Sequence, residues 1–111
     1  MRGRVGVEIK YDDLELMELF YSEGQSLTGN IEDGDILYRR SNENFKLTMF
    51  IYNYEQRINI FLQYKEMDMI SIELKDVSSL QKADHYLKIY RNDQEVGNIC
   101  FGENFLISIE D

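Results

Sequence analysis

The side chains of this 111-residue chain that could act as nucleophiles or proton carriers are few. His85 is its only histidine, and Cys100 is its only cysteine. Asp84 precedes His85, but adjacent residues of an extended segment point to opposite faces, which argues against a catalytic pair. Cys100 has no basic neighbour in sequence to lower the pKa of its thiol, so a buried, unreactive thiol is expected. With no nucleotide-binding or hydrolase motif either, the sequence predicts neither an enzyme nor a cofactor-binding protein.

Carboxylates are abundant, with 21 acidic residues against 12 basic ones and a net charge of −9. Glu32, Asp33 and Asp35 surround Gly34 and could bind a hard cation through their oxygens. They lack the spacing of an EF-hand loop, so we expect a solvated hairpin tip and no metal site. Some other pair of carboxylates could lie close enough for two-carboxylate hydrolysis, which keeps an enzymatic β-barrel as an alternative.

The acidic residues are concentrated towards the N-terminus. Residues 1–37 hold nine acidic and three basic residues, a net charge of −6, whereas residues 38–111 hold twelve and nine, a net charge of −3. This balance disfavours nucleic acid and an anionic membrane as partners, since both need clustered cations. It suits a basic protein, which it would attract over a distance, although the charge could serve solubility alone. The acidic candidates for partner contacts are Glu15, Glu18, Glu23, Glu32, Asp33 and Asp35.

Aromatic residues define a second candidate surface. Phe50, Tyr52 and Tyr54 alternate with the residues expected to face the core. Tyr52 and Tyr54 are therefore candidate anchors for a protein partner, because tyrosine supplies much contact area at an interface. The alternative is that a second sheet covers this face, as in a sandwich. The aromatic side chains that could share the face are Phe50, Tyr52, Tyr54, Phe61, Tyr86 and Tyr90.

The elements that must position these residues are mainly strands. Three runs, at 45–52, 57–65 and 69–75, alternate apolar and polar residues with a period of two, which predicts strands with one face in the core. The links 53–56 and 66–68 are too short for a crossover, so the strands must be antiparallel.

A helix is predicted over residues 12–24. Asp12 is a good N-cap with Glu15 three residues on, as in a capping box, and Gly24 stands where a helix would end. Glu15, Glu18 and Ser22 fall on the polar side of the helical wheel. The residues on its apolar side are Leu14, Leu16, Met17, Phe20 and Tyr21.

The remaining segments complete a mostly β fold. Val5, Val7 and Ile9 predict a short strand over residues 5–10, and Asp33-Gly34 predicts a type I′ turn in a hairpin within 25–40. Residues 76–84 break the alternation and are expected to be a loop with Leu80 pointing inward. Residues 86–90, 96–101 and 105–109 return to period two.

These elements add up to seven or eight strands and one helix in a single domain spanning residues 1–111. We expect an antiparallel meander that forms a sandwich or flattened barrel with one short N-terminal helix. The alternative is an α+β arrangement in which the helix covers one face of a single sheet.

The N-terminal segment MRGRVGVEIK lacks the apolar stretch of a signal peptide. No apolar run approaches the length of a membrane span, and a lone cysteine leaves no internal disulfide. We therefore expect a cytoplasmic protein.

Four segments carry a resemblance to known proteins: DDLELMELFYSEG at 12–24, FKLTMFIYNYEQRINIFLQY at 45–64, ELKDV at 73–77 and GENFLISIE at 102–110. The chain resembles small acidic, β-rich proteins of Gram-positive bacteria that are uncharacterised or classed as immunity proteins of polymorphic toxins. The resemblance implies a cytosolic, non-enzymatic protein that binds and blocks one toxin domain. The acidic charge favours a basic, nuclease-type toxin as that partner.

Two other functions stay open at this point. A small-ligand-binding or enzymatic β-barrel would require a pocket with buried titratable groups. A homomeric structural or assembly subunit would join copies of itself through strand edges, because the chain has no proline to protect them.

Overall fold

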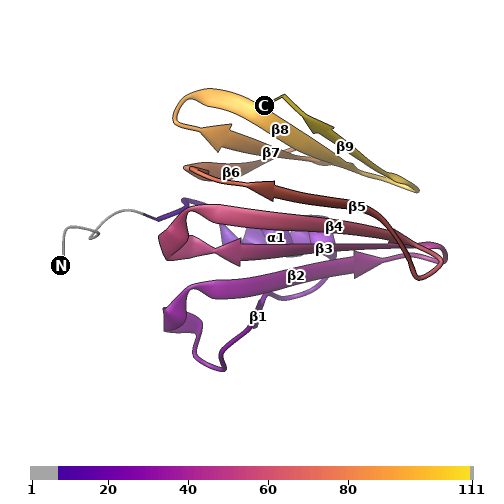
Figure 1. The fold of residues 1–111 in the computed structure, drawn as a ribbon, viewed down its shortest axis with the longest axis horizontal. Coiled ribbons are helices and arrows are strands. Elements are labelled where there is room, and N and C mark those ends of the chain that lie inside the picture. The colour runs from indigo at the N-terminus through magenta and orange to yellow at the C-terminus, as the bar shows by residue number, and fades with distance from the viewer. Residues whose placement is uncertain (1–7, 111) are drawn as a thin grey trace.

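The strands form two antiparallel sheets packed against each other in the computed structural model, which describes residues 8–110 (Figure 1). The first sheet has the order β1-β2-β3-β4-β5: Gln25–Ser26, Asp35–Ser41, Phe45–Tyr52, Arg57–Tyr64 and Met67–Leu74. The second has the order β6-β7-β8-β9: Ser79–Ala83, Tyr86–Arg91, Gln94–Phe101 and Phe105–Ile109. The predicted mostly β sandwich is confirmed. The two sheets do not close into a barrel, and the single-sheet alternative is wrong.

Strands β3, β4 and β5 are the three alternating runs of the sequence, and their prediction is confirmed. Met49 pairs with Ile60 and Ile51 with Ile58, and all four side chains are fully buried. The two-residue link Lys65-Glu66 has positive φ angles of 48° and 70°, as the turn of a tight hairpin requires. The strict alternation of apolar and polar residues was thus enough to identify these strands and the face of each that lies in the core.

The helix α1 spans Asp13–Phe20, shorter than predicted. Asp12 is the N-cap, but it accepts a hydrogen bond from the Leu14 N–H at 2.8 Å and forms no capping box with Glu15. The helix ends at Tyr21, which adopts the left-handed conformation and donates its N–H to the Met17 carbonyl. The prediction that Gly24 ends the helix is therefore wrong.

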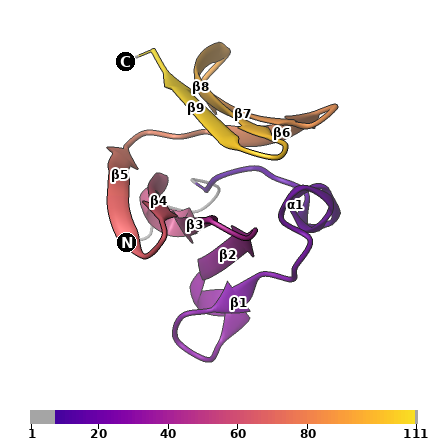
Figure 2. The ribbon, with the colours of Figure 1, turned by 90° about the vertical axis from the view of Figure 1, so that its right-hand side faces the viewer.

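The inward face of α1 also differs from the prediction. Leu16, Leu19 and Phe20 are buried, whereas Leu14 and Tyr21 are exposed. The reason is the position of the helix, which lies along one side of the sandwich between β2 and β6 (Figure 2). There the Phe20 ring packs between rings from both sheets, with centroids 5.5 Å from Tyr38 and 5.0 Å from Phe101. The helix therefore contributes a narrow stripe to one shared core.

Three further predictions need correction. Residues 76–84 contain the strand β6, and within it Leu80 points inward as expected. Asp33-Gly34 is not a hairpin turn, because residues 31–33 form a short 3-10 helix, η1 (Ile31–Asp33), that Gly34 ends. Half of the strand predicted at 5–10, including Val5 and Val7, lies outside the described residues. Within them, Lys10 forms an isolated parallel bridge with Ser79.

With the two-residue β1 included, residues 8–110 contain nine strands, against the seven or eight predicted. The predicted C-terminal strands correspond to β7, β8 and β9. None of the helices in residues 8–110 combines the length and the apolar composition needed to cross a membrane.

Candidate functional site

A cleft of about 490 Å³ opens at the end of the sandwich where β2 begins and β3 ends. Segments that are distant in the sequence form its walls: the start of α1, the end of the β1–β2 connection, and the 3-10 helix η2 (Asn53–Glu55) between β3 and β4. The lining residues are Tyr11, Asp13, Met17, Glu23, Gly24, Ile31, Gly34, Ile36, Tyr38, Asn53 and Tyr54.

Two glycines allow the tyrosines to close around the cleft. A Cβ atom at Gly24 would lie 2.8 Å from the ring of Tyr38. Gly34 has a φ of 81°, and a Cβ there would lie 2.8 Å from the ring of Tyr54. Because Gly34 needs both the left-handed conformation and the space, a larger residue would displace Tyr54 from the wall.

Hydrogen bonds hold the tyrosines in place. The Tyr38 hydroxyl donates to Asp13 Oδ1 at 2.9 Å, which joins β2 to the first turn of α1. The Tyr54 hydroxyl donates to the Glu32 carbonyl at 3.1 Å, and the Asn53 N–H donates to the Gly34 carbonyl at 3.0 Å. The last two bonds, from Tyr54 and Asn53, fix η2 against the loop that precedes β2.

The cleft carries negative charge. Asp13 and Glu23 line it, and no lysine, arginine or histidine of residues 8–110 does. Burial, together with the negative charges of Asp13 and Glu8, raises the pKa of Tyr11 to about 12. Burial and the hydrogen bond to Asp13 raise the pKa of Tyr38 as well. Both phenols therefore stay protonated, as neutral donors beside two carboxylates.

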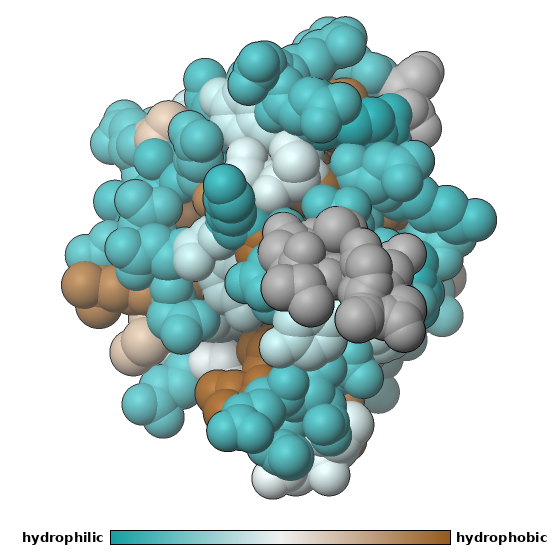
Figure 3. Space-filling model, turned by 90° about the vertical axis from the view of Figure 1, so that its left-hand side faces the viewer, coloured by the Kyte–Doolittle hydropathy of each residue, from teal (hydrophilic) through white to brown (hydrophobic). Residues whose placement is uncertain are grey.

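The acidic loop beside the cleft is built on its own hydrogen bonds. The Asn30 side chain caps η1 by accepting the Glu32 N–H at 3.0 Å. The Thr28 hydroxyl donates to Asp33 Oδ2 at 2.6 Å. Glu32 and Asp33 are exposed, and Asp35 is half-buried at the start of β2. Figure 3 views this end of the molecule, where hydrophilic side chains predominate and apolar side chains form small separate patches, one of which protrudes at the left edge.

Two of the predicted acidic contacts lie away from the cleft. Glu15 Oε1 accepts a hydrogen bond from the Lys82 backbone N–H at 3.2 Å, and Glu18 Oε1 lies 3.7 Å from Lys82 Nζ. Both carboxylates therefore connect α1 to β6. Of the six acidic candidates, the structure brings only Glu23, Glu32, Asp33 and Asp35 to the cleft end of the molecule.

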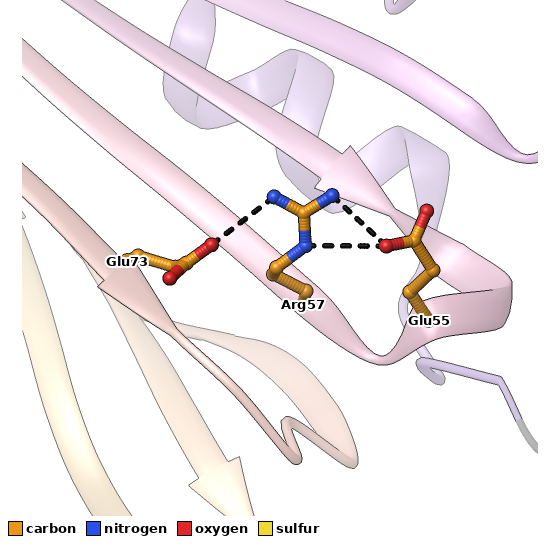
Figure 4. A network of polar contacts seen from close by, with 3 residues as sticks. All are labelled: Glu55, Arg57 and Glu73. Atoms are coloured by element: carbon orange, nitrogen blue, oxygen red, sulfur yellow. Dashed lines mark hydrogen bonds and ion pairs between the residues drawn. The ribbon is translucent and has the colours of Figure 1, made fainter.

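The two tyrosine candidates separate as well. Tyr54 lines the cleft, whereas Tyr52 stands on the outer face of the first sheet with the Arg57 guanidinium 4.1 Å from its ring centroid. Figure 4 shows how Arg57 is held there, by Glu55 at 2.9 Å and Glu73 at 3.2 Å. Arg57 therefore already stacks on Tyr52, a contact that a partner would otherwise make.

The predicted aromatic surface exists in a smaller form. Phe50 and Phe61 are half-buried neighbours on that outer face, with ring centroids 5.5 Å apart. The second sheet packs on the opposite, inner face, so it does not cover them. The suggestion that Tyr86 and Tyr90 join them is wrong, because both belong to β7 of the second sheet.

His85 and Cys100 lie outside the cleft. His85 is exposed in the turn between β6 and β7, where Asp84 has a φ of 60° and the Asp84 Oδ2 atom lies 3.2 Å from His85 Nδ1. The expectation that the two side chains point apart is wrong, because the pair is a turn and not an extended segment. Cys100 is half-buried, not buried, and its contact with Tyr86 raises the pKa of that phenol. No group of three or more potential metal ligands occurs within residues 8–110.

Sequence reasoning missed Tyr11, Asp13 and Tyr38, which make up much of the cleft wall. One signal was present: Asp13 and Met17 are four residues apart and therefore share a face of the helix. The meeting of that face with Tyr38 could not be read from spacing, because 25 residues separate Asp13 from Tyr38.

Comparison with known proteins adds one solved structure to this description. Neither a family model nor a curated protein sequence matches the chain. The fold is similar to that of one chain in a contact-dependent growth inhibition toxin–immunity protein complex from Klebsiella pneumoniae 342. The TM-score is 0.73, and the match covers 92% of this chain and 95% of that chain at 18% sequence identity. At this identity the likeness is one of fold.

Proposed function

We propose that this chain is an immunity protein that binds a polypeptide toxin domain and blocks it without catalysing a reaction. The observation that carries the proposal is the shared fold, because nearly the whole length of both chains is matched and the solved chain belongs to a toxin–immunity complex. The resemblance of the sequence to small acidic immunity proteins points the same way. We further propose that the protein is bacterial, acts in the cytoplasm and consists of one domain.

A chain from such a complex is either the toxin or its inhibitor, and the chemistry favours the inhibitor. The only histidine lies in an exposed turn, far along the chain from the cleft residues, and the cleft phenols are held in their neutral form. The cleft end instead offers carboxylates and tyrosines. These groups suit recognition of a basic surface, with the charge steering the encounter.

The test is neutralisation of a toxin domain, with the product of the neighbouring gene as the first candidate. That domain is expressed in a bacterial host with this chain or with a non-cognate immunity protein, and growth is measured. We expect growth only with this chain, and a stable complex of the two purified proteins by size-exclusion chromatography. Growth arrest despite soluble expression of both proteins, or the absence of a complex, would refute the proposal.

Self-assembly is a second candidate function, and β9 favours it. This strand forms an edge of the second sheet, contains neither proline nor a charged residue, and exposes Leu106. Such an edge can pair with a strand of another copy. Sedimentation velocity over a wide concentration range decides the matter, because a protein that stays monomeric throughout does not assemble through β9.

A further inference from the structure

We propose that the cleft receives one arginine side chain of the protein partner, an inference that rests on the proposed function. Asp13 and Glu23 would hold the guanidinium, and the tyrosines would form the walls around it.

Charge selects a cation for this site. Glu23 forms no hydrogen bond or ion pair with any residue in the described range, and Asp13 uses one carboxylate oxygen for Tyr38. No cationic side chain of residues 8–110 lines the cleft to neutralise them. An anion would meet two carboxylates, and the N–H of Leu14 in the first turn of α1 is already bonded to Asp12. A positively charged group therefore gains most from entering.

The walls select arginine over lysine. Tyr11 is half-buried and Tyr54 is exposed, so these two lining residues offer aromatic surface, on which a planar guanidinium stacks better than a compact, strongly hydrated ammonium. Tyr38 is fully buried and contributes to the site through its hydrogen bond to Asp13. Carboxylates bind the guanidinium in a fixed, two-point geometry that an ammonium cannot reproduce. Among the other lining residues, Ile31 is exposed and gives the methylene stem of an arginine an apolar contact.

The cleft is also formed before any partner arrives. The bond from Tyr54 to the Glu32 carbonyl and the Asn30 cap hold the loop, and the bond from Tyr38 to Asp13 holds the opposite wall. An incoming arginine therefore orders few side chains, which lowers the entropic cost of binding.

A peptide titration tests the site without any toxin. The blocked tripeptide Ac-Gly-Arg-Gly-NH₂ is added to the labelled full chain, and the backbone amide signals of Gly24 and Gly34 are followed by heteronuclear NMR. The control peptide carries citrulline, which keeps the shape of arginine and lacks its charge. A third peptide carries lysine in place of arginine. We expect concentration-dependent shifts at both glycines with the arginine peptide, weaker shifts with the lysine peptide and none with the citrulline peptide.

Variants locate the contact. Glu23→Gln should weaken arginine-peptide binding about two- to fivefold, the range expected for one solvent-accessible charge pair. Glu103→Gln, an exposed glutamate between β8 and β9, should leave it unchanged. Equal shifts with citrulline, no shift at either glycine, or equal effects of the two variants would overturn the inference.

The outcome is separable from that of the proposed function. A chain that neutralises the toxin but does not respond to the arginine peptide remains an immunity protein, and the cleft is then not its arginine site. In a complex that forms, replacing the docked toxin arginine by lysine should weaken binding to the wild-type chain about tenfold and should weaken binding to the Glu23→Gln variant less. Equal losses for every toxin arginine in both backgrounds would contradict the assignment.

Discussion

Two groups of carboxylates from the acidic N-terminal third of the chain have opposite surroundings. The helix-side pair, Glu15 and Glu18, faces β6 and shares Lys82. The cleft-end group forms no ion pair with any residue of the described range; its members are Glu23, Glu32, Asp33 and Asp35. Every carboxylate of the two groups contributes equally to the net charge, which therefore cannot distinguish them. Because the topology places Lys82 against α1, Glu15 and Glu18 stabilise the fold, whereas the cleft-end group stays without a cation from residues 8–110.

The largest effect expected from this comparison is on partner binding. Replacing all four cleft-end acids by lysine should weaken binding of the toxin domain about 100-fold at low salt, since each exposed charge contributes roughly 0.5–1 kcal/mol. Isothermal titration calorimetry at low and at high salt measures the change, which screening should reduce. The matched control is Glu15→Lys combined with Glu18→Lys, which should leave affinity unchanged and is compared with Glu23→Lys combined with Glu32→Lys. Equal losses in the two variants would remove the distinction between the groups.

The next effect is on stability, and it belongs to the helix-side pair. Glu15→Ala leaves the part-buried Lys82 N–H without its acceptor and should lower the free energy of unfolding by about 1 kcal/mol. Glu15→Gln keeps an acceptor oxygen and should cost less than half as much. Urea denaturation measures both. A Gln variant as unstable as the Ala variant would show that the hydrogen bond is not the source of the stability.

Glu18 should matter less than Glu15. Its carboxylate lies 3.7 Å from Lys82 Nζ, and about half of its side chain is exposed. Glu18→Ala should therefore lower the free energy of unfolding by only about 0.3 kcal/mol, and the loss should disappear in high salt. If the loss persists in high salt, Glu18 contributes through packing and not through charge.

The smallest effect should have the opposite sign. Glu23 and Asp13 line the same cleft, and no cationic side chain of residues 8–110 lines it with them. Glu23→Gln should therefore raise the free energy of unfolding by a few tenths of a kcal/mol, roughly 0.2–0.4, at low ionic strength. Thermal denaturation at low and high salt detects it as a small, salt-dependent rise in Tm. A decrease would mean that Glu23 belongs with the stabilising acids.

The strands that the sequence predicted best are those whose burial alternates strictly. In β3 and β4, inward residues such as Met49 and Ile60 recur every second position, so the pattern alone identifies the strands. The strand β6 was missed because only Leu80 in it is buried, and an edge strand needs little apolar sequence. The end of α1 was missed because the left-handed Tyr21 lies under the Arg40 guanidinium, 4.0 Å from its ring centroid, a contact made only after folding.

The candidate site was predictable only in part. The excess of acidic residues in the N-terminal third predicted a partner surface there, and the predicted contacts included Glu23 and Glu32. This part of the site was predictable because acidic residues with no nearby cation in sequence are usually exposed. It could not separate them from Glu15, since the deciding residue, Lys82, is 67 positions away. The tyrosine walls come from segments that only the tertiary fold brings together.

The loop between β1 and β2 folds largely on bonds made within itself. Thr28, Asn30 and Asp33 satisfy one another and the local backbone, and Leu27 and Ile31 in the same stretch are exposed. Side chains of this kind can be exchanged at little cost to the core, because surface substitutions rarely change stability by more than about 0.5 kcal/mol. The consequence is evolutionary: the exposed side chains of this loop can vary among descendants of this chain while the sandwich beneath it is inherited intact.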